Sequence, residues 1–261
     1  MIPLDRFDYK ALSDEEKAAA DRLGSKFSPF GMAVVRLSFA DRLYTPAPLG
    51  LLLPAVEHLM LRTPSVAAHV TPSEVSLFLW APSAKVPTFL DRRVPTIVAH
   101  VASVLQAGLL DKATDSDDVT NNVAALCLGV APMRCIAREW ICNTEEAFTE
   151  ILGYTRWRAS AAFNDHVTRQ CSVLGYSQKY LLGKTLQSRQ SFVAAQDQVP
   201  LVGFDDAPCG YMFSPEHDSS GANPAQRQRK INREAVDYPA LVTQLEQRLE
   251  AERLTAPGIR V

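Results

Sequence analysis

Helix-start signals recur along this 261-residue chain, and they constrain its fold more than any other feature of the sequence. Thr71, Pro72 and Glu74 supply an N-cap, a proline and an acidic residue directly before the apolar run VSLFLW. Pro95 opens another segment, TIVAHVASVLQAGLL, whose apolar residues recur at helical spacing. The best strand candidate is MAVVRLSF, at 32–39, and this run could equally be helical. The pattern therefore predicts a mainly α fold.

Changes in composition along the chain divide it into three expected regions, which together form a single helical core domain with extended N- and C-terminal arms. We expect an N-terminal arm with a first helix at 1–48, where Ser13 and Glu16 form a capping box. A helical core is expected at 49–198. The segment 199–261 begins with irregular sequence rich in proline and glycine, so we expect an extended arm that ends in an amphipathic helix.

Composition narrows the class of protein. The N-terminal segment is too polar for a signal peptide, and no apolar run reaches the roughly 18 residues that a membrane helix needs. The five cysteines are widely spaced and contain no CxxC pair, which argues against a disulfide framework and against a zinc site. We therefore expect a cytosolic protein with no membrane partner, no metal and no other cofactor.

A surplus of basic residues marks the segment 154–192, although the whole chain carries a formal net charge of −2. Asp165 is its single acidic residue, and aromatic residues, Trp157 and Tyr180 among them, are interleaved with the cations. Cations with aromatic rings are the composition of single-strand nucleic-acid binding. Acidic residues elsewhere, such as those at 111–118, could instead balance this charge within the fold. The predicted phosphate path from this segment comprises Arg156, Arg158, Arg169, Lys184 and Arg189.

Two arginine placements sharpen the prediction of a phosphate path. The segment APMRCIAREWIC, at 131–142, is expected to form a short helix on which Arg134 and Arg138 share one face. No carboxylate follows on that face, so both arginines are expected to contact phosphate. Farther along, Arg189 falls inside the apolar arc of a predicted helix, where a guanidinium needs a buried carboxylate or a bound phosphate.

Two further stretches carry a family pattern: PMRCIAREW at 132–140, and FVAAQD followed after a gap by APCGYMFSPEHDSSGANPAQ. The first is similar to a helix with an LRxxxR-type pattern, and the second to a FAAFD … PxxGLIRxPTxxE segment. In order and rough spacing they resemble coat proteins of flexuous filamentous plant RNA viruses. The position that matches the aspartate of that family is Gln196, with Asp197 beside it.

The resemblance implies a mostly helical core that binds single-stranded RNA in a groove, with arms that link subunits. It implies that Arg134 contacts the RNA, with Arg138 nearby, and that Asp197 helps to hold the pocket. We therefore predict a viral coat or nucleocapsid subunit, without enzymatic activity, that packages single-stranded RNA and assembles into a filament or capsid. Its expected location is the virion or the host cytoplasm, and Trp157 and Tyr180 would stack on bases.

Two other functions fit the same sequence. One is a helical scaffold or adaptor whose arm and last helix bind protein partners only. The other is an enzyme that uses the Asp205–Asp206 pair or Cys209, in the irregular segment after 199. The sequence contains neither a GxGxxG nor a GxxxxGK[ST] motif, and its five histidines are dispersed, so the enzyme is the weaker alternative.

Overall fold

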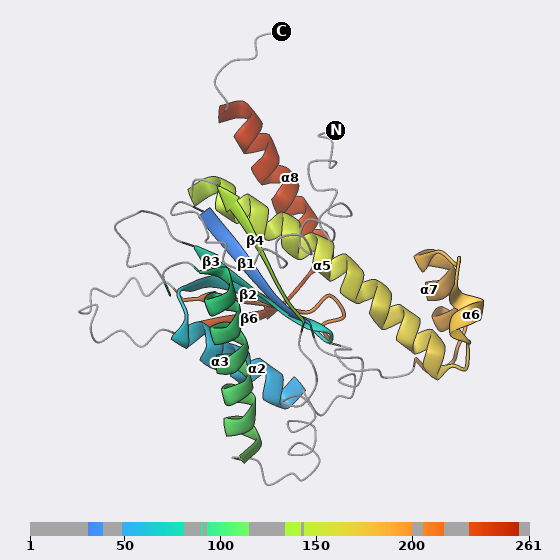
Figure 1. Ribbon diagram of the computed structural model, residues 1–261. Coiled ribbons are helices and arrows are strands. Elements are labelled where there is room, and N and C mark those ends of the chain that lie inside the picture. The colour runs from blue at the N-terminus through green and yellow to red at the C-terminus, as the bar shows by residue number, and fades with distance from the viewer. Residues whose placement is uncertain are drawn as a thin grey trace.

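A six-stranded antiparallel sheet forms the centre of the protein, in the strand order β4-β1-β3-β2-β5-β6 (Figure 1). The computed structural model describes residues 31–38, 49–80, 90, 93–114, 134–141, 144–199, 206–216 and 230–255. The strands are β1 (Gly31–Ser38), β2 (Ser65–Thr71), β3 (Glu74–Trp80), β4 (Arg134–Ile141), β5 (Tyr211–Pro215) and β6 (Ile231–Ala235). The prediction of a mainly α fold with a helical core and extended arms is therefore wrong.

Helices cover both faces of this sheet (Figure 1). One face packs against α2 (Leu49–Arg62) and α3 (Val94–Thr114), and the other against α5 (Thr144–Val173). The last helix, α8 (Tyr238–Thr255), packs against α5. Two short helices, α6 (Gln178–Leu181) and α7 (Leu186–Ala194), pack at the C-terminal end of α5, away from the sheet (Figure 1).

Burial on both faces explains why the central strands were missed. In β2, Val70 packs towards α2 and α3 while Ala67 packs towards α5, and β3 is buried in the same two-sided way by Leu77 and Phe78. A strand buried on both faces is apolar almost throughout, so it loses the alternation that identifies a half-exposed strand. Sequence periodicity alone cannot separate such a strand from a buried helix.

Two segments expected to be helical are part of the sheet. Pro72 and Ser73 form the turn between β2 and β3, and VSLFLW, expected to continue a helix, lies in β3. The segment expected as an arginine-bearing helix is β4, where Ser38 is the register partner of Arg134 and Val34 that of Arg138. In both places, pairing with a distant strand overrides a local helix signal.

Other local predictions are confirmed. The helix expected from Pro95 is α3, and the strand candidate at 32–39, which could equally have been helical, forms β1 between β4 and β3. In α8, Leu245 and Leu249 of the leucine stripe are buried against Leu152 and Trp157 of α5. The capping box expected in the N-terminal segment lies outside the described residues.

Candidate functional site

Polar side chains interrupt the otherwise apolar face of the sheet that α5 covers. Arg36 and Ser76 are register partners, and so are Ser76 and His69, so the three form a row across β1, β3 and β2. Every one of the sheet residues involved is buried. We call the following set the polar cluster: Arg36, His69, Thr71, Glu74, Ser76 and, from α5, Arg158.

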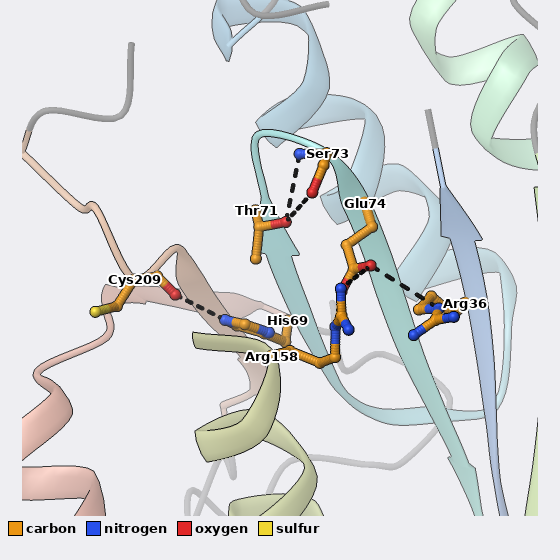
Figure 2. A network of polar contacts seen from close by, with 7 residues as sticks. All are labelled: Arg36, His69, Thr71, Ser73, Glu74, Arg158 and Cys209. Carbon is orange, nitrogen blue, oxygen red and sulfur yellow. Dashed lines mark hydrogen bonds and ion pairs between the residues drawn. The ribbon is translucent and has the colours of Figure 1, made fainter. Parts of the chain in front are cut away.

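The carboxylate of Glu74 lies at the centre of the polar cluster, and two guanidinium groups hold it (Figure 2). Arg158 donates from Nε to Oε1 and from Nη2 to Oε2, the latter over 2.6 Å. The Nε atom of Arg36 lies 3.8 Å from Oε2. The Glu74 side chain is 4% exposed, so this ion pair is largely withdrawn from water. A buried carboxylate is stable only with such partners, and the two-pronged arginine contact is among the strongest available.

Trp157 extends the polar cluster on the α5 side. The guanidinium carbon of Arg158 lies 4.5 Å from the centre of the indole ring, and that of Arg36 lies 5.8 Å from it. Tyr154 packs edge-on against Trp157 and also against Phe78 of β3. Cation–π contacts of this kind fix the direction of a guanidinium. Both arginines are therefore positioned by a carboxylate and by an aromatic ring.

His69 ties the polar cluster to the start of β5. Its Nε2–H donates to the carbonyl oxygen of Cys209 over 3.0 Å (Figure 2), and burial lowers the pKa of His69 to about 4. Gly210 follows with a φ of 90°, and a Cβ there would lie 2.3 Å from the carbonyl oxygen of Val70. Nδ1 of His69 and Oγ of Ser76 have no hydrogen-bond partner among the described residues. The ring is thus neutral, and the close backbone approach requires a glycine.

A second region is built from the C-terminal half of α5, α6 and α7, and we call it the helical module. Its centre is a small apolar cluster of Val167, Cys171, Leu181 and Val193. Arg189 of α7 reaches back to α5. The acceptors of its three hydrogen bonds are Asn164 Oδ1 at 3.0 Å, Thr168 Oγ1 at 2.8 Å and Lys184 O at 3.0 Å. All three acceptors are neutral, and the buried Nε of Arg189 has no hydrogen-bond partner among the described residues, so the phosphate contact expected for Arg189 stays a prediction.

Aromatic rings and a lysine lie together on the helical module. Tyr176 stacks on Tyr180 and on Phe192, with ring centroids 5.7 and 4.9 Å apart. Nζ of Lys184 lies 5.1 Å from the centre of the Tyr180 ring, and Tyr180 is 47% exposed. Lys179 precedes Tyr180 on α6 and is exposed. This surface therefore offers a partly exposed aromatic ring beside two positive charges.

The structure divides the predicted phosphate path between these two regions. Arg158 belongs to the polar cluster, and Trp157 packs against it. Arg156 precedes them on α5, and its buried Nε has no hydrogen-bond partner among the described residues. Arg134 and Arg138 lie on β4, where their positions are known from the pairing with β1. Asp197 is exposed just after α7. The remaining predicted residues lie in the helical module: Arg169, Tyr180, Lys184 and Arg189.

Sequence reasoning missed the sheet residues of the polar cluster. The signal that could have identified them is a charged residue within or next to an apolar run, as Arg36 is in VVRLS and Glu74 is before VSLFLW. Charged residues are almost never fully buried unless they are paired, so each of these positions indicates a partner elsewhere in the fold.

The loop that the enzyme alternative used has structural contacts of its own. The hydroxyl of Tyr211 donates to Asp206 across the turn before β5. Burial raises the pKa of the Cys209 thiol, and since the thiolate is the nucleophile, this disfavours a cysteine-dependent reaction. Within the described part of the chain, no three acidic, histidine or cysteine side chains come together as a metal site would require.

Comparison with known proteins identifies the fold. No protein-family model and no curated protein matches the sequence. A solved bacterial tRNA(His) guanylyltransferase (Thg1)-like protein in complex with ATP matches with a TM-score of 0.59 at 13% identity, over 91% of this chain and 98% of the other. A bacterial Thg1-like protein in complex with GTP matches with a TM-score of 0.53 at 11% identity, over 92% and 99%. The chain therefore has the Thg1-like α/β fold.

This likeness overturns the predicted viral coat or nucleocapsid protein. The resemblance rested partly on a helix at 132–140 that the structure replaces with β4. The predictions of assembly into a filament or capsid, of a location in the virion and of no enzymatic activity are wrong for the same reason, because the shared fold is that of guanylyltransferase (Thg1)-like proteins. Among the described helices, none combines the length and the apolar character needed to cross a bilayer.

Proposed function

We propose that this chain binds a purine nucleoside triphosphate at the polar cluster and transfers its nucleotidyl group to RNA. The proposal rests on one observation above all: Arg36 and Arg158 are held together over a sheet whose fold is shared with proteins solved with ATP and with GTP. Arginine suits a phosphate ligand because its planar guanidinium can donate two parallel hydrogen bonds.

The polar cluster reaches the surface at one end of the sheet, where β1 ends and β2 turns into β3. Ser38 and Ser73 are half-buried there, and their hydroxyl groups can donate to phosphate oxygens. Ser38 is the register partner of both Glu74 and Arg134. Arg134 thus stands as a proposed additional phosphate contact, on a strand that reaches the same end of the sheet.

The reaction requires an RNA oxygen to attack the α-phosphorus of the nucleotide. A new bond forms between that oxygen and phosphorus, the bond to the bridging oxygen breaks, and pyrophosphate leaves with the electron pair. The proton of an attacking hydroxyl passes to water. Negative charge accumulates on the leaving pyrophosphate, and guanidinium groups already in place would stabilise it without having to reorganise.

The helical module is the proposed RNA-binding surface. Tyr180 offers a partly exposed ring that contacts Tyr176 and Phe192, and Nζ of Lys184 lies over that ring. A base can stack on such a ring while the lysine contacts a phosphate. The positive charge of Arg189 adds to the attraction, because its hydrogen bonds go to neutral oxygens.

The nucleotide site can be tested with Arg36→Met, which keeps the length of the side chain and removes its charge. Isothermal titration of ATP and of GTP should show affinity reduced by about tenfold or more. Arg233→Met on β6 is the matched control, since Arg233 lies outside the polar cluster. Unchanged nucleotide affinity in Arg36→Met would contradict the proposal.

The RNA surface and the reaction need separate measurements. Tyr180→Ala combined with Lys184→Ala should weaken binding of a tRNA transcript by about tenfold or more in an electrophoretic shift. Lys230→Ala is the matched control, because Lys230 is exposed beside β6. Incubation of the wild type with α-labelled ATP or GTP and RNA should yield labelled RNA, and an unlabelled product would refute nucleotidyl transfer.

A further inference from the structure

Glu74 has a role in the polar cluster that decides how a nucleotide can bind there. Nucleoside triphosphates are often bound with Mg²⁺, which a protein holds through one or two carboxylates while the phosphates supply further ligands. Glu74 is the acidic member of the polar cluster, so it is the side chain to examine for this role.

The oxygens of Glu74 are already engaged. Arg158 donates to both of them, and the Nε atom of Arg36 approaches one of the same two. These hydrogen bonds leave a lone pair on each oxygen, and a divalent ion would have to use it directly beside the arginines. It would also lie within a few ångströms of two guanidinium groups, in a region where burial weakens the screening of charge. Glu74 therefore fits the role of an anion between two arginines and does not fit that of a metal ligand.

Among the described residues, the groups beside Glu74 at this end of the sheet bring no negative charge. Ser38 is the register partner of Glu74, and it contributes a hydroxyl. The hydroxyl of Thr71 accepts from the backbone N–H of Ser73 and lies 3.3 Å from the hydroxyl of Ser73 (Figure 2). Hard divalent cations prefer carboxylates to hydroxyls, so these side chains do not replace the engaged carboxylate.

We infer that the polar cluster binds the triphosphate directly through Arg36 and Arg158, without a divalent cation bridging it to Glu74. This inference rests on the proposed nucleotide site. Glu74 then acts as a positioning residue, because it holds both guanidinium groups at the same end of the sheet. The guanidinium groups take the electrostatic role that a metal ion has in many enzymes that act on phosphates.

Titration of the full chain with ATP, first in EDTA and then in excess Mg²⁺, tests the inference directly. We expect the affinity in Mg²⁺ to be equal to that in EDTA or weaker, because Mg²⁺ neutralises part of the triphosphate charge that the arginines attract. Affinity tightened about tenfold or more by Mg²⁺ would overturn it. Absence of binding in both solutions would instead contradict the proposed function, and the inference would fall with it.

Direct metal binding provides a readout that does not depend on the nucleotide. Mn²⁺ titrated into the protein alone, and followed by electron paramagnetic resonance, should show no bound ion whose signal depends on Glu74. The test variant is Glu74→Gln and the matched control is Glu246→Gln on the exposed side of α8. A bound Mn²⁺ signal that Glu74→Gln removes and Glu246→Gln keeps would overturn the inference.

The same variant gives different results for the two roles in nucleotide binding. If Glu74 only positions the arginines, Glu74→Gln should change the affinity for ATP by the same factor in EDTA and in Mg²⁺, because its effect acts through Arg36 and Arg158 in both solutions. If Glu74 were a metal ligand, Glu74→Gln should weaken ATP binding by about tenfold or more in Mg²⁺ and leave it unchanged in EDTA. Circular dichroism checks that Glu74→Gln is folded, and the wild-type titrations decide the matter if it is not.

Discussion

The polar cluster and the helical module both keep arginine side chains away from bulk water, but they satisfy them differently. In the polar cluster, Arg36 and Arg158 meet a carboxylate that is itself almost fully buried. In the helical module, Arg189 is held by an amide oxygen, a hydroxyl and a backbone carbonyl. The first arrangement sets one carboxylate against two positive charges, whereas the second holds its positive charge with neutral oxygens.

The two regions differ in the partners of their arginines because the sites are buried to different depths. Removing a charge from water is costly, and neutral oxygens can compensate only where solvent still reaches part of the group. Glu74 lies under α5 in the sheet core, while α7 packs on the end of α5 with much of its surface exposed. A guanidinium group is thus a structural and ligand-positioning element in one region and a surface cation in the other.

Removal of the acceptor in each region is the strongest way to break this comparison. Glu74→Ala leaves two guanidinium groups facing each other in the core, so the free energy of unfolding should fall by about 3–5 kcal/mol. Asn164→Ala removes one neutral acceptor from Arg189, and the loss should be about 1 kcal/mol. Urea denaturation of both variants measures the two values, and equal losses would mean that the two regions do not differ as described.

The polar cluster should also give the protein a pH dependence through His69. The pKa is about 4 in the folded chain and about 6.5 in the unfolded one, so protons bind the unfolded chain preferentially between these values. The stabilisation is complete above pH 6.5 and is lost as the pH falls towards 4, by about 3 kcal/mol in full. Denaturation between pH 7.5 and 4.5 should show this slope, and His69→Gln should flatten it.

A matched substitution of His100 on α3 serves as the control for this pH dependence. Because His100 lies outside the polar cluster, His100→Gln should keep the slope of the wild type. A slope that His69→Gln leaves intact would show that another group is responsible.

Two glycines with nearly the same backbone conformation allow the comparison to be sharpened. Gly210, at a φ of 90°, has no room for a Cβ beside Val70, whereas Gly175, at 88°, has nothing within 4 Å of that position. Gly210→Ala should therefore destabilise the protein by about 3 kcal/mol and Gly175→Ala by about 1–2 kcal/mol. Thermal or urea denaturation of the pair separates the effect of crowding from that of backbone strain.

The smallest expected effect belongs to Arg189, and it should be local. Arg189→Met removes three hydrogen bonds that tie α7 to α5 and to Lys184, with a loss of about 1–2 kcal/mol. Hydrogen exchange should accelerate in α7 and stay unchanged in α2 and α3. Faster exchange throughout the sheet would show that the helical module is coupled to the rest of the fold.

Helices whose signals lie in residues close together in the sequence were predictable. The helix from Pro95 was identified from a proline at its start and a 3.6-residue apolar period, both of which are local properties. The leucine stripe of α8 predicted a docked helix for the same reason. In contrast, β4 was taken for a helix because Arg134 and Arg138 fit a helical spacing as well as a strand, and the pairing with β1 decided between them.

Only the α5 side of the polar cluster was predictable. Composition pointed to Arg158 and Trp157, because basic and aromatic residues are crowded in 154–192. Glu74, the partner of Arg158, is 84 residues away from it along the chain. In the sequence, Glu74 was interpreted as part of a helix N-terminal cap. The same composition placed Arg158 and Arg189 on one path, although Arg158 on α5 contacts Glu74 of the sheet and Arg189 lies on α7, in the helical module.

By itself, the sequence determined where helices such as α3 and α8 lie and where positive charge gathers, since both depend on residues close together in the chain. The tertiary structure alone decided that the strands form one sheet, that Glu74 meets two arginines, and that Arg189 donates to three neutral oxygens. The physical reason is that a charged side chain takes its role from whichever group lies within a few ångströms. Strand pairing and helix packing between distant segments bring those groups together.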